Sequence, residues 1–131
     1  MKYILLIYGD EREWTSMSQE DMAKVYQEHG AYSDALVKAG VMRGGYELQP
    51  VATATSVRFT NGKARTSDGP FAETKEQLGG YYVIEARDLN EAILVASRIP
   101  GARIGCVEVR PVADDAQTLR ALGFAPQGAQ A

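Results

Sequence analysis

The chain has 131 residues, of which 45% are hydrophobic and 24% are charged, and its formal net charge is −3. This length and composition are typical of a single globular domain with its own core. The basic residues are scattered, so no nucleic-acid surface is predicted. With one cysteine and one histidine, and no phosphate-loop or dinucleotide motif, the chain is expected to bind no metal and no organic cofactor.

The apolar start, residues 3–8, is too short for a secretory signal core or a membrane helix. It is apolar at both parities, which predicts a strand with both faces covered. The lone thiol of Cys106 is typical of a reducing compartment, and the residue is expected to be a small buried hydrophobe. A cytoplasmic protein is therefore predicted.

Residues 9–17 are predicted to form a polar loop that contains Trp14. A helix is then expected from Ser18, which begins a capping box with an acidic first turn, to Gly40, which is a favourable helix stop. Apolar residues between these ends recur at helical spacing.

A strand is expected at 41–48, weakened by two glycines. Residues 56–60 and 63–67 alternate around Asn61-Gly62, which predicts a β-hairpin with a type I′ turn.

Residues 81–85 are expected to form the next strand, opened by the pair Gly79-Gly80. A second capping box at Asp88 predicts a short helix that Pro100 stops. Further along, the pattern predicts a strand at 104–110, a final helix that starts at Asp114-Asp115 and is capped by Gly123, and a frayed end at 125–131.

This order predicts an α+β fold, the ferredoxin-like split βαβ–βαβ unit with an inserted β-hairpin, over residues 1–112. Residues 113–131 are expected to be a C-terminal helix and tail of the same domain. Both helices would cover one face of the sheet. The other face would carry either Tyr3, Leu5 and Ile7 or Ile4, Leu6 and Tyr8, depending on the register. A second copy packed sheet to sheet would cover it and give a homodimer.

The loop that follows the hairpin is the most specific part of the chain, and it carries a resemblance to a family. Its residues Asp68-Gly69-Pro70-Phe71-Ala72-Glu73-Thr74-Lys75-Glu76 resemble the motif of the DGPF-domain proteins in the YCII-related group. The opening residues 1–10, the segment Gly79-Gly80-Tyr81-Tyr82 and residues 107–111 are also similar, so that the resemblance covers about residues 1–112.

The resemblance implies a dimeric α+β barrel whose function is poorly defined. Some YCII relatives are enzymes that act on small aromatic compounds, with a histidine–aspartate pair proposed as the acid and base. DGPF proteins are often encoded beside extracytoplasmic-function sigma factors, which implies a possible link to transcriptional regulation.

His29 is the only histidine, and it follows Val25 and Tyr26 on the apolar stripe of the first predicted helix. One interpretation is a general acid–base group that Asp68 orients. The other is a structural histidine bonded to a carbonyl group or a tyrosine. Asp68 could equally cap its own turn, while Phe71 in the same loop is expected to be exposed and to contact a ligand.

Glu108 and Arg110 are predicted to face the barrel interior if Val107 and Val109 face the helices. There Arg110 could bind an anionic substrate, with Glu108 beside it. The alternative is a structural ion pair across the dimer. Tyr82 could stack on an aromatic ligand or could simply pack in the core.

Two functions therefore stay open. The first is a cofactor-free enzyme that holds a small polar or aromatic molecule in a dimer-barrel cleft, with His29 or Asp68 moving a proton. The second is a non-catalytic sensor or interaction dimer linked to a sigma factor.

Overall fold

The computed structural model describes residues 1–113 and 115–124. Asp114, where the last helix was expected to start, and the predicted frayed end at 125–131 lie outside the described residues. The central element is a four-stranded antiparallel sheet with the strand order β2-β5-β1-β6. Its strands are β1 (Lys2–Gly9), β2 (Met42–Glu47), β5 (Gln77–Glu85) and β6 (Cys106–Pro111). This order is that of the ferredoxin-like split βαβ unit, so the predicted fold class is confirmed.

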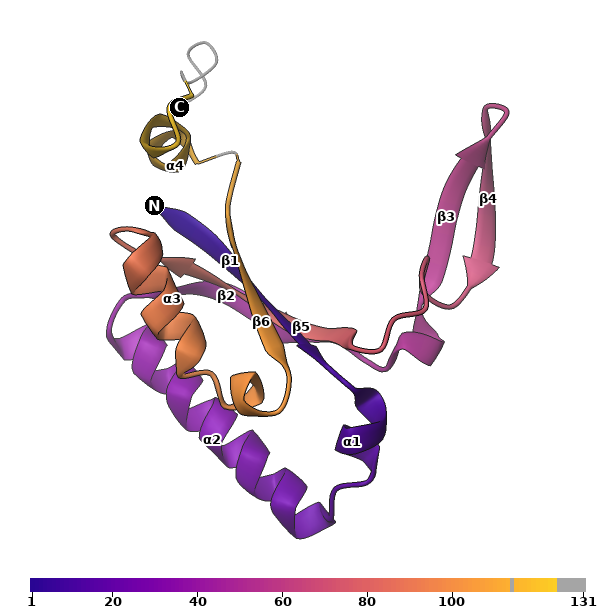
Figure 1. The fold of residues 1–131 in the computed structure, drawn as a ribbon, viewed down its shortest axis with the longest axis horizontal. Helices are drawn as coiled ribbons and strands as arrows, with labels where there is room; N and C mark the ends of the chain where they lie inside the picture. Colours follow the sequence, from indigo (N-terminus) through magenta and orange to yellow (C-terminus); the bar gives the residue numbers. More distant parts are fainter. Residues whose placement is uncertain (114, 125–131) are drawn as a thin grey trace.

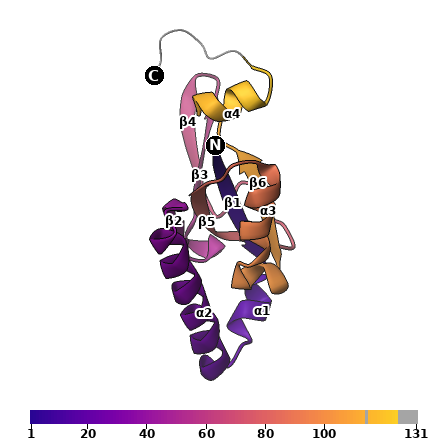
Figure 2. The same cartoon turned by 90° about the vertical axis from the view of Figure 1, so that its left-hand side faces the viewer.

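Two helices, α2 (Gln19–Lys38) and α3 (Leu89–Ser97), cover one face of this sheet (Figures 1 and 2). Both predicted N-caps are confirmed: the Ser18 side chain accepts a hydrogen bond from the Asp21 amide, and Asp88 accepts one from the Glu91 amide. The expected stop of α2 is also confirmed, because Gly40 has a φ of 73°, in the left-handed region.

The core lies between the sheet and these helices. Tyr3, Leu5 and Ile84 are buried there, and Val107 and Val109 pack against them. The register that the sequence left open is therefore settled. Odd-numbered residues of β1 face the helices, and the even-numbered residues lie on the other face of the sheet, which no helix of the described residues covers (Figure 1).

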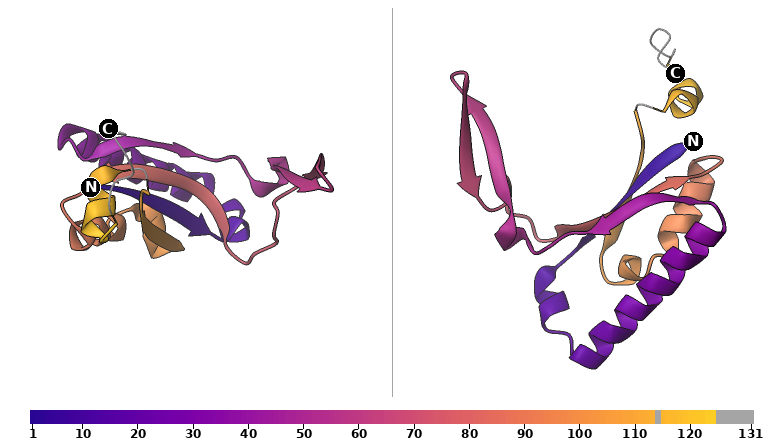
Figure 3. Two further views of the ribbon diagram at one scale, coloured as in Figure 1. Left: turned by 90° about the horizontal axis from the view of Figure 1, so that it is seen from above. Right: turned by 180° about the vertical axis from the view of Figure 1, so that it is seen from behind.

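The hairpin consists of β3 (Thr55–Thr60) and β4 (Lys63–Asp68), which pair only with each other as a separate two-stranded sheet. Asn61 and Gly62 have φ values of 52° and 76°, as a type I′ turn requires, so the predicted hairpin is confirmed. It stands away from the main sheet (Figures 1 and 3).

Residues 9–17 were expected to be a loop, but they contain the short helix α1 (Glu11–Thr15). The Asp10 carboxylate caps this helix by accepting a hydrogen bond from the Arg12 amide, and two glutamates stand in its first turn. A cap and an acidic first turn favour even one turn of helix. That signal was present in the sequence, but the segment is too short to show helical periodicity.

The pair Gly79-Gly80 was expected to open a strand, whereas it lies inside β5. A Cβ on Gly80 would come within 3.0 Å of the Tyr46 carbonyl oxygen of β2, so the missing side chain allows the two strands to approach. Cys106 was expected to be buried, but it is exposed on the open side of β6.

The remaining elements are short: η1 (Val51–Thr53), η2 (Pro100–Arg103) and α4 (Ala116–Ala121). Gly123 ends α4 with a φ of 86°, as expected of a helix stop. Within the part of the chain that the structure describes, no helix is long and apolar enough to span a membrane.

Candidate functional site

A cavity of about 790 Å³ lies between the sheet, α1 and the middle of α2. Its size is in the range of small-molecule sites. Residues of β1, β2, β5 and η2 complete its walls. The side chains that matter for its chemistry fall into three groups, namely aromatic rings, carboxylates and proton-transferring groups: Trp14, Tyr26 and Tyr82; Asp10, Glu11, Glu13 and Glu47; His29 and Ser33.

His29 projects from α2 into this cavity and meets a tyrosine of the central strand β5. Its Nδ1 lies 3.3 Å from the Tyr82 hydroxyl oxygen, and the Ser33 hydroxyl donates to the same oxygen at 3.4 Å. The two groups can share one proton, and the tautomer of the imidazole decides which of them donates it. Gly101 of η2 borders the ring: a Cβ there would lie 3.6 Å from Nε2, at an ordinary van der Waals distance.

Burial lowers the pKa of His29 below its ordinary value of 6.5, since desolvation penalises the imidazolium. Glu47 and Glu28 oppose this shift by attracting the charged form, and Arg103 adds to it. His29 is therefore neutral at pH 7. A neutral imidazole can accept a proton, and nearby carboxylates can then stabilise the cation that forms.

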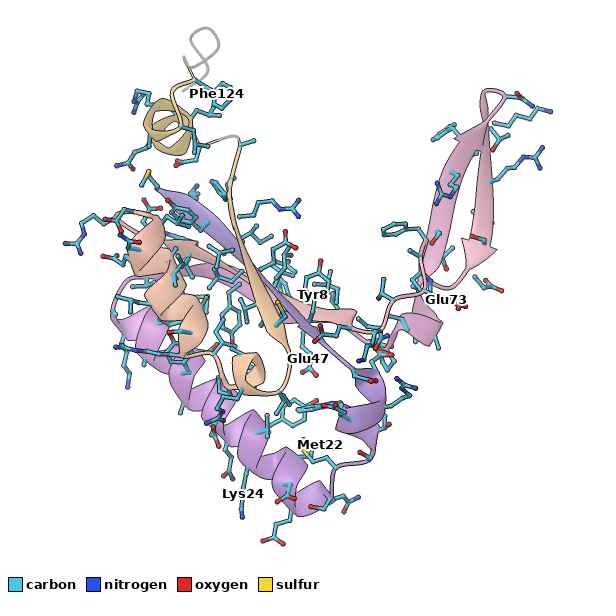
Figure 4. All side chains as sticks on the ribbon, viewed as in Figure 1. Tyr8, Met22, Lys24, Glu47, Glu73 and Phe124 are labelled. Atoms are coloured by element: carbon cyan, nitrogen blue, oxygen red, sulfur yellow. The ribbon has the colours of Figure 1, made fainter. Side chains whose placement is uncertain are left out.

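Tyr26 and Glu47 form a second polar contact, one helical turn from His29. The Tyr26 hydroxyl donates to Glu47 Oε1 at 2.8 Å, and this hydrogen bond raises the pKa of Tyr26. Trp14 of α1 packs edge-on to Tyr26, with ring centroids 5.6 Å apart. Glu47 lies on the helix side of the sheet, and Tyr8 on the opposite side (Figure 4).

Carboxylates dominate the charge of the cavity wall, and no lysine or arginine is among the described residues that line it. Asp10 is partly neutralised by Arg12 at 3.0 Å, a contact whose hydrogen bond lowers the pKa of Asp10. Glu11 holds η1 against α1, because its carboxylate accepts from the Val51 amide at 3.1 Å. Glu47 and Glu13 remain to attract a bound cation.

Of the predicted site residues, only His29 and Tyr82 meet in this cavity. Asp68 ends β4 in the projecting hairpin and is exposed, and Phe71 beyond it is 80% exposed. Neither lines the cavity. The described contacts of His29 do not include Asp68, so the acid–base pairing of these two residues stays a prediction.

Glu108 and Arg110 lie on the open face of the sheet, where Arg110 donates to the Glu108 carboxylate in the same strand. Their predicted placement opposite Val107 and Val109 is confirmed, since those two valines pack in the core. An ion pair within the chain is thus observed. Binding of an anionic substrate by Arg110, and a pair across a dimer, stay predictions.

Among the cavity residues that the sequence did not predict as site residues, Trp14, Tyr26, Ser33 and Glu47 make the ring contact and the side-chain hydrogen bonds described above. Tyr26 and Ser33 could have been found, because they flank His29 three and four residues away on the same helix. Glu47 could not. The register of β2 shifts between Met42 and Gly44, and this bulge turns Glu47 toward the helices.

Within residues 1–113 and 115–124, no group of three or more histidine, cysteine, aspartate or glutamate side chains is arranged to hold a metal ion. The side chains of the site itself offer groups for proton transfer, hydrogen bonding and aromatic packing around a ligand.

Comparison with known proteins shows which family this chain resembles. The model of the YCII-related domain matches residues 1–115. An uncharacterized protein of Rhizobium meliloti (strain 1021), R00369, is 37% identical over 115 residues, which span 86% of this chain and 93% of that protein. The expected sigma-factor link stays a prediction, as does the narrower DGPF grouping. The match over most of the chain places it in a family: it belongs to the YCII-related domain proteins.

Proposed function

We propose that the protein binds a small aromatic or polar molecule in the cavity between α2 and the sheet, and that His29 and Tyr82 transfer a proton there. The observation that carries this proposal is the contact at 3.3 Å between a neutral imidazole and a tyrosine hydroxyl inside a cavity of about 790 Å³. Groups with a shifted pKa in a cavity with aromatic walls are typical of a functional site.

The proton would move along a short relay. As the Tyr82 oxygen takes a proton from the ligand, its own proton passes to Nδ1 of His29, which becomes the imidazolium. Ser33 holds the tyrosine oxygen in place, and Glu47 attracts the new positive charge. The reverse movement returns a proton to the product, so the protein ends in its starting state.

The walls favour a neutral or cationic ligand over an anionic one. Carboxylates line the cavity and, of its described lining residues, none is a lysine or an arginine. Trp14 and Tyr26 offer rings against which an aromatic or ammonium group can pack. We therefore expect phenols and aromatic amines to bind more tightly than aromatic carboxylates of the same size.

Trp14 provides a direct test, because it is the only tryptophan and lines the cavity. A panel of matched phenols, aromatic amines and aromatic carboxylates should change its fluorescence on binding. Tyr26→Ala should weaken binding by about tenfold, in line with the loss of one aromatic contact. The control Phe59→Ala, on the hairpin, should leave the affinity unchanged. Fluorescence that no member of the panel alters, or a preference for the carboxylates, would contradict the proposal.

Catalysis and sensing differ in the fate of the ligand. With an identified ligand, Tyr82→Phe should preserve the fluorescence change and lower the rate of proton exchange from the ligand by about 10²-fold or more, the usual contribution of a general acid or base. The non-catalytic sensor would be favoured if the protein does not raise the rate of proton exchange from the ligand and the ligand is recovered unchanged.

The pKa of His29 can be measured by proton NMR without ambiguity, since the chain has one histidine. It should lie below 6.5, and Glu47→Gln should lower it further by removing a negative charge that favours the imidazolium. Asp68→Asn should leave it unchanged. A large response to Asp68→Asn and none to Glu47→Gln would instead support the pair predicted from the sequence.

The same shift gives the protein a pH-dependent stability with a definite sign. The folded-state pKa lies below the unfolded value, so at pH values below about 6.5 the unfolded chain binds more protons. The free energy of unfolding should therefore fall as the pH is lowered through 6.5, and His29→Gln should remove this part of the dependence in urea titrations.

A further inference from the structure

The β3–β4 hairpin has one basic and one apolar face. Arg58 and Arg65 are direct cross-strand partners, and Lys63 lies on the same face next to the turn. The opposite face carries Val57 and Phe59, whose side chains are 58% and 77% exposed. Neither face is covered by another described element of the chain (Figures 1 and 3).

Such a hairpin is poorly stabilised by itself. A lone two-stranded hairpin is marginal in water, and like charges directly opposite each other weaken the pair further. The apolar side chains of Val57 and Phe59 contribute little to the stability of the folded chain, because they are largely exposed to water. The arrangement is consistent instead with a surface that becomes covered by a partner, which would bury the apolar face and neutralise the arginines.

Charge indicates what the partner is. The hairpin contains three basic residues and one acidic residue, Asp68 at its base, so it carries +2. The whole chain carries −3, so the remainder carries −5. A second copy of the chain thus has a net negative charge outside its hairpin, which complements the positive charge of the hairpin. Three cations beside two exposed apolar side chains suit such a protein surface better than a nucleic-acid backbone, which demands a longer basic stretch.

The position of the hairpin agrees with this choice. The hairpin and α4 both rise from the side of the main sheet opposite α2 and α3 (Figures 1 and 2). Between them lies the open face of the sheet, which carries Leu6 and Tyr81 in register. Leu122 and Phe124, at the α4 end, are exposed apolar residues too. A partner bound on the open face would therefore lie between the hairpin and α4, both of which also carry exposed apolar side chains.

We propose that the β3–β4 hairpin is a dimerisation arm. A second copy covers the open face of the sheet, and the arm of each copy packs Val57 and Phe59 on the other while Arg58 and Arg65 meet its acidic surface. This role of the hairpin in dimerisation is independent of the ligand binding and proton transfer proposed for the cavity.

Light scattering after size exclusion tests the arm. The wild type should be a dimer at a protein concentration of about 50 µM, at which a dimer with a micromolar dissociation constant is mostly assembled. Val57→Ser/Phe59→Ser and Arg58→Glu/Arg65→Glu should each raise the dissociation constant at least tenfold. The control Lys24→Glu/Arg98→Glu makes the same change in net charge at exposed positions of α2 and the end of α3, and should leave the dimer intact.

Cys106 gives a second readout that does not depend on molecular size. It is the only thiol and lies on the open face, opposite Tyr8 in the β1–β6 ladder. In the wild-type dimer it should react with a maleimide at least tenfold more slowly than in either arm variant at the same concentration. Because the arm shares no strand pairing with the main sheet, the variants should keep the wild-type circular dichroism spectrum.

Three results would overturn the proposal: a wild type that is monomeric at about 50 µM, arm variants that dimerise as tightly as the wild type, or thiol reactivity that is fast in all proteins. A monomeric wild type that binds duplex DNA, and loses that binding in Arg58→Glu/Arg65→Glu, would assign the basic face to nucleic acid instead.

Discussion

Replacing Gly105 by alanine is expected to lower the free energy of unfolding by about 3 kcal/mol, the upper part of the usual range for forcing atoms into a filled space. A Cβ at this position would lie 2.0 Å from the Tyr8 carbonyl oxygen and 3.1 Å from Gly9 Cα. Both are backbone atoms of β1 or its end, so no side-chain rotation relieves the clash. The start of β6 would have to move away from β1. Urea denaturation measures the loss.

Gly30→Ala is the matched control for this substitution. Gly30 lies within α2, and a Cβ there would meet nothing within 4 Å. Alanine in the middle of a helix is favoured over glycine by about 1 kcal/mol. The same chemical change should thus stabilise the protein at residue 30 and destabilise it at residue 105. A Gly105→Ala protein as stable as the wild type would show that β6 does not approach β1 as described.

Leu5→Ala is expected to cost about 3 kcal/mol of unfolding free energy, because the side chain is fully buried among the residues of the core. The loss combines the transfer of apolar atoms with the cavity that remains. It should appear in urea denaturation at every protein concentration, since the contacts lie within one chain.

Leu6→Ala makes the same change one residue further along β1, on the open face of the sheet. If a second copy covers that face, Leu6→Ala should raise the dissociation constant of the dimer and should lower stability in a way that depends on protein concentration. Equal, concentration-independent losses for the two variants would contradict the assignment of the two faces of β1.

Much of the fold follows from local patterns in the chain. Ser18 and Asp88 are strong helix caps, and Asn61-Gly62 is the favoured pair for a two-residue hairpin turn. Each of these signals acts over three or four residues, so tertiary contacts do not override it. The short helix α1 was missed because a five-residue element has no measurable periodicity.

The candidate site was only partly predictable. His29 could be placed on the apolar stripe of α2, but its partner could not be identified from spacing. The pairing of β1 with β5 sets Leu5 beside Tyr82 on the helix side of the sheet, and this is what brings the tyrosine under the histidine. The loop at Asp68 appeared the more specific candidate from its residues alone. The structure places it at the base of the hairpin, outside the cavity lining.

The sequence by itself therefore determined the order of the main helices and strands and the fold class, because caps, turns and alternating apolar residues are local signals. It also determined the family, through the motif at residues 68–76. Tertiary structure alone decided which face of β1 is buried, which tyrosine meets His29, and that Glu47 joins the cavity. The physical reason is register. A strand alternates with period two, so one bulge in β2, or the choice between two pairings of β1, exchanges the residues that face the helices with those that face away.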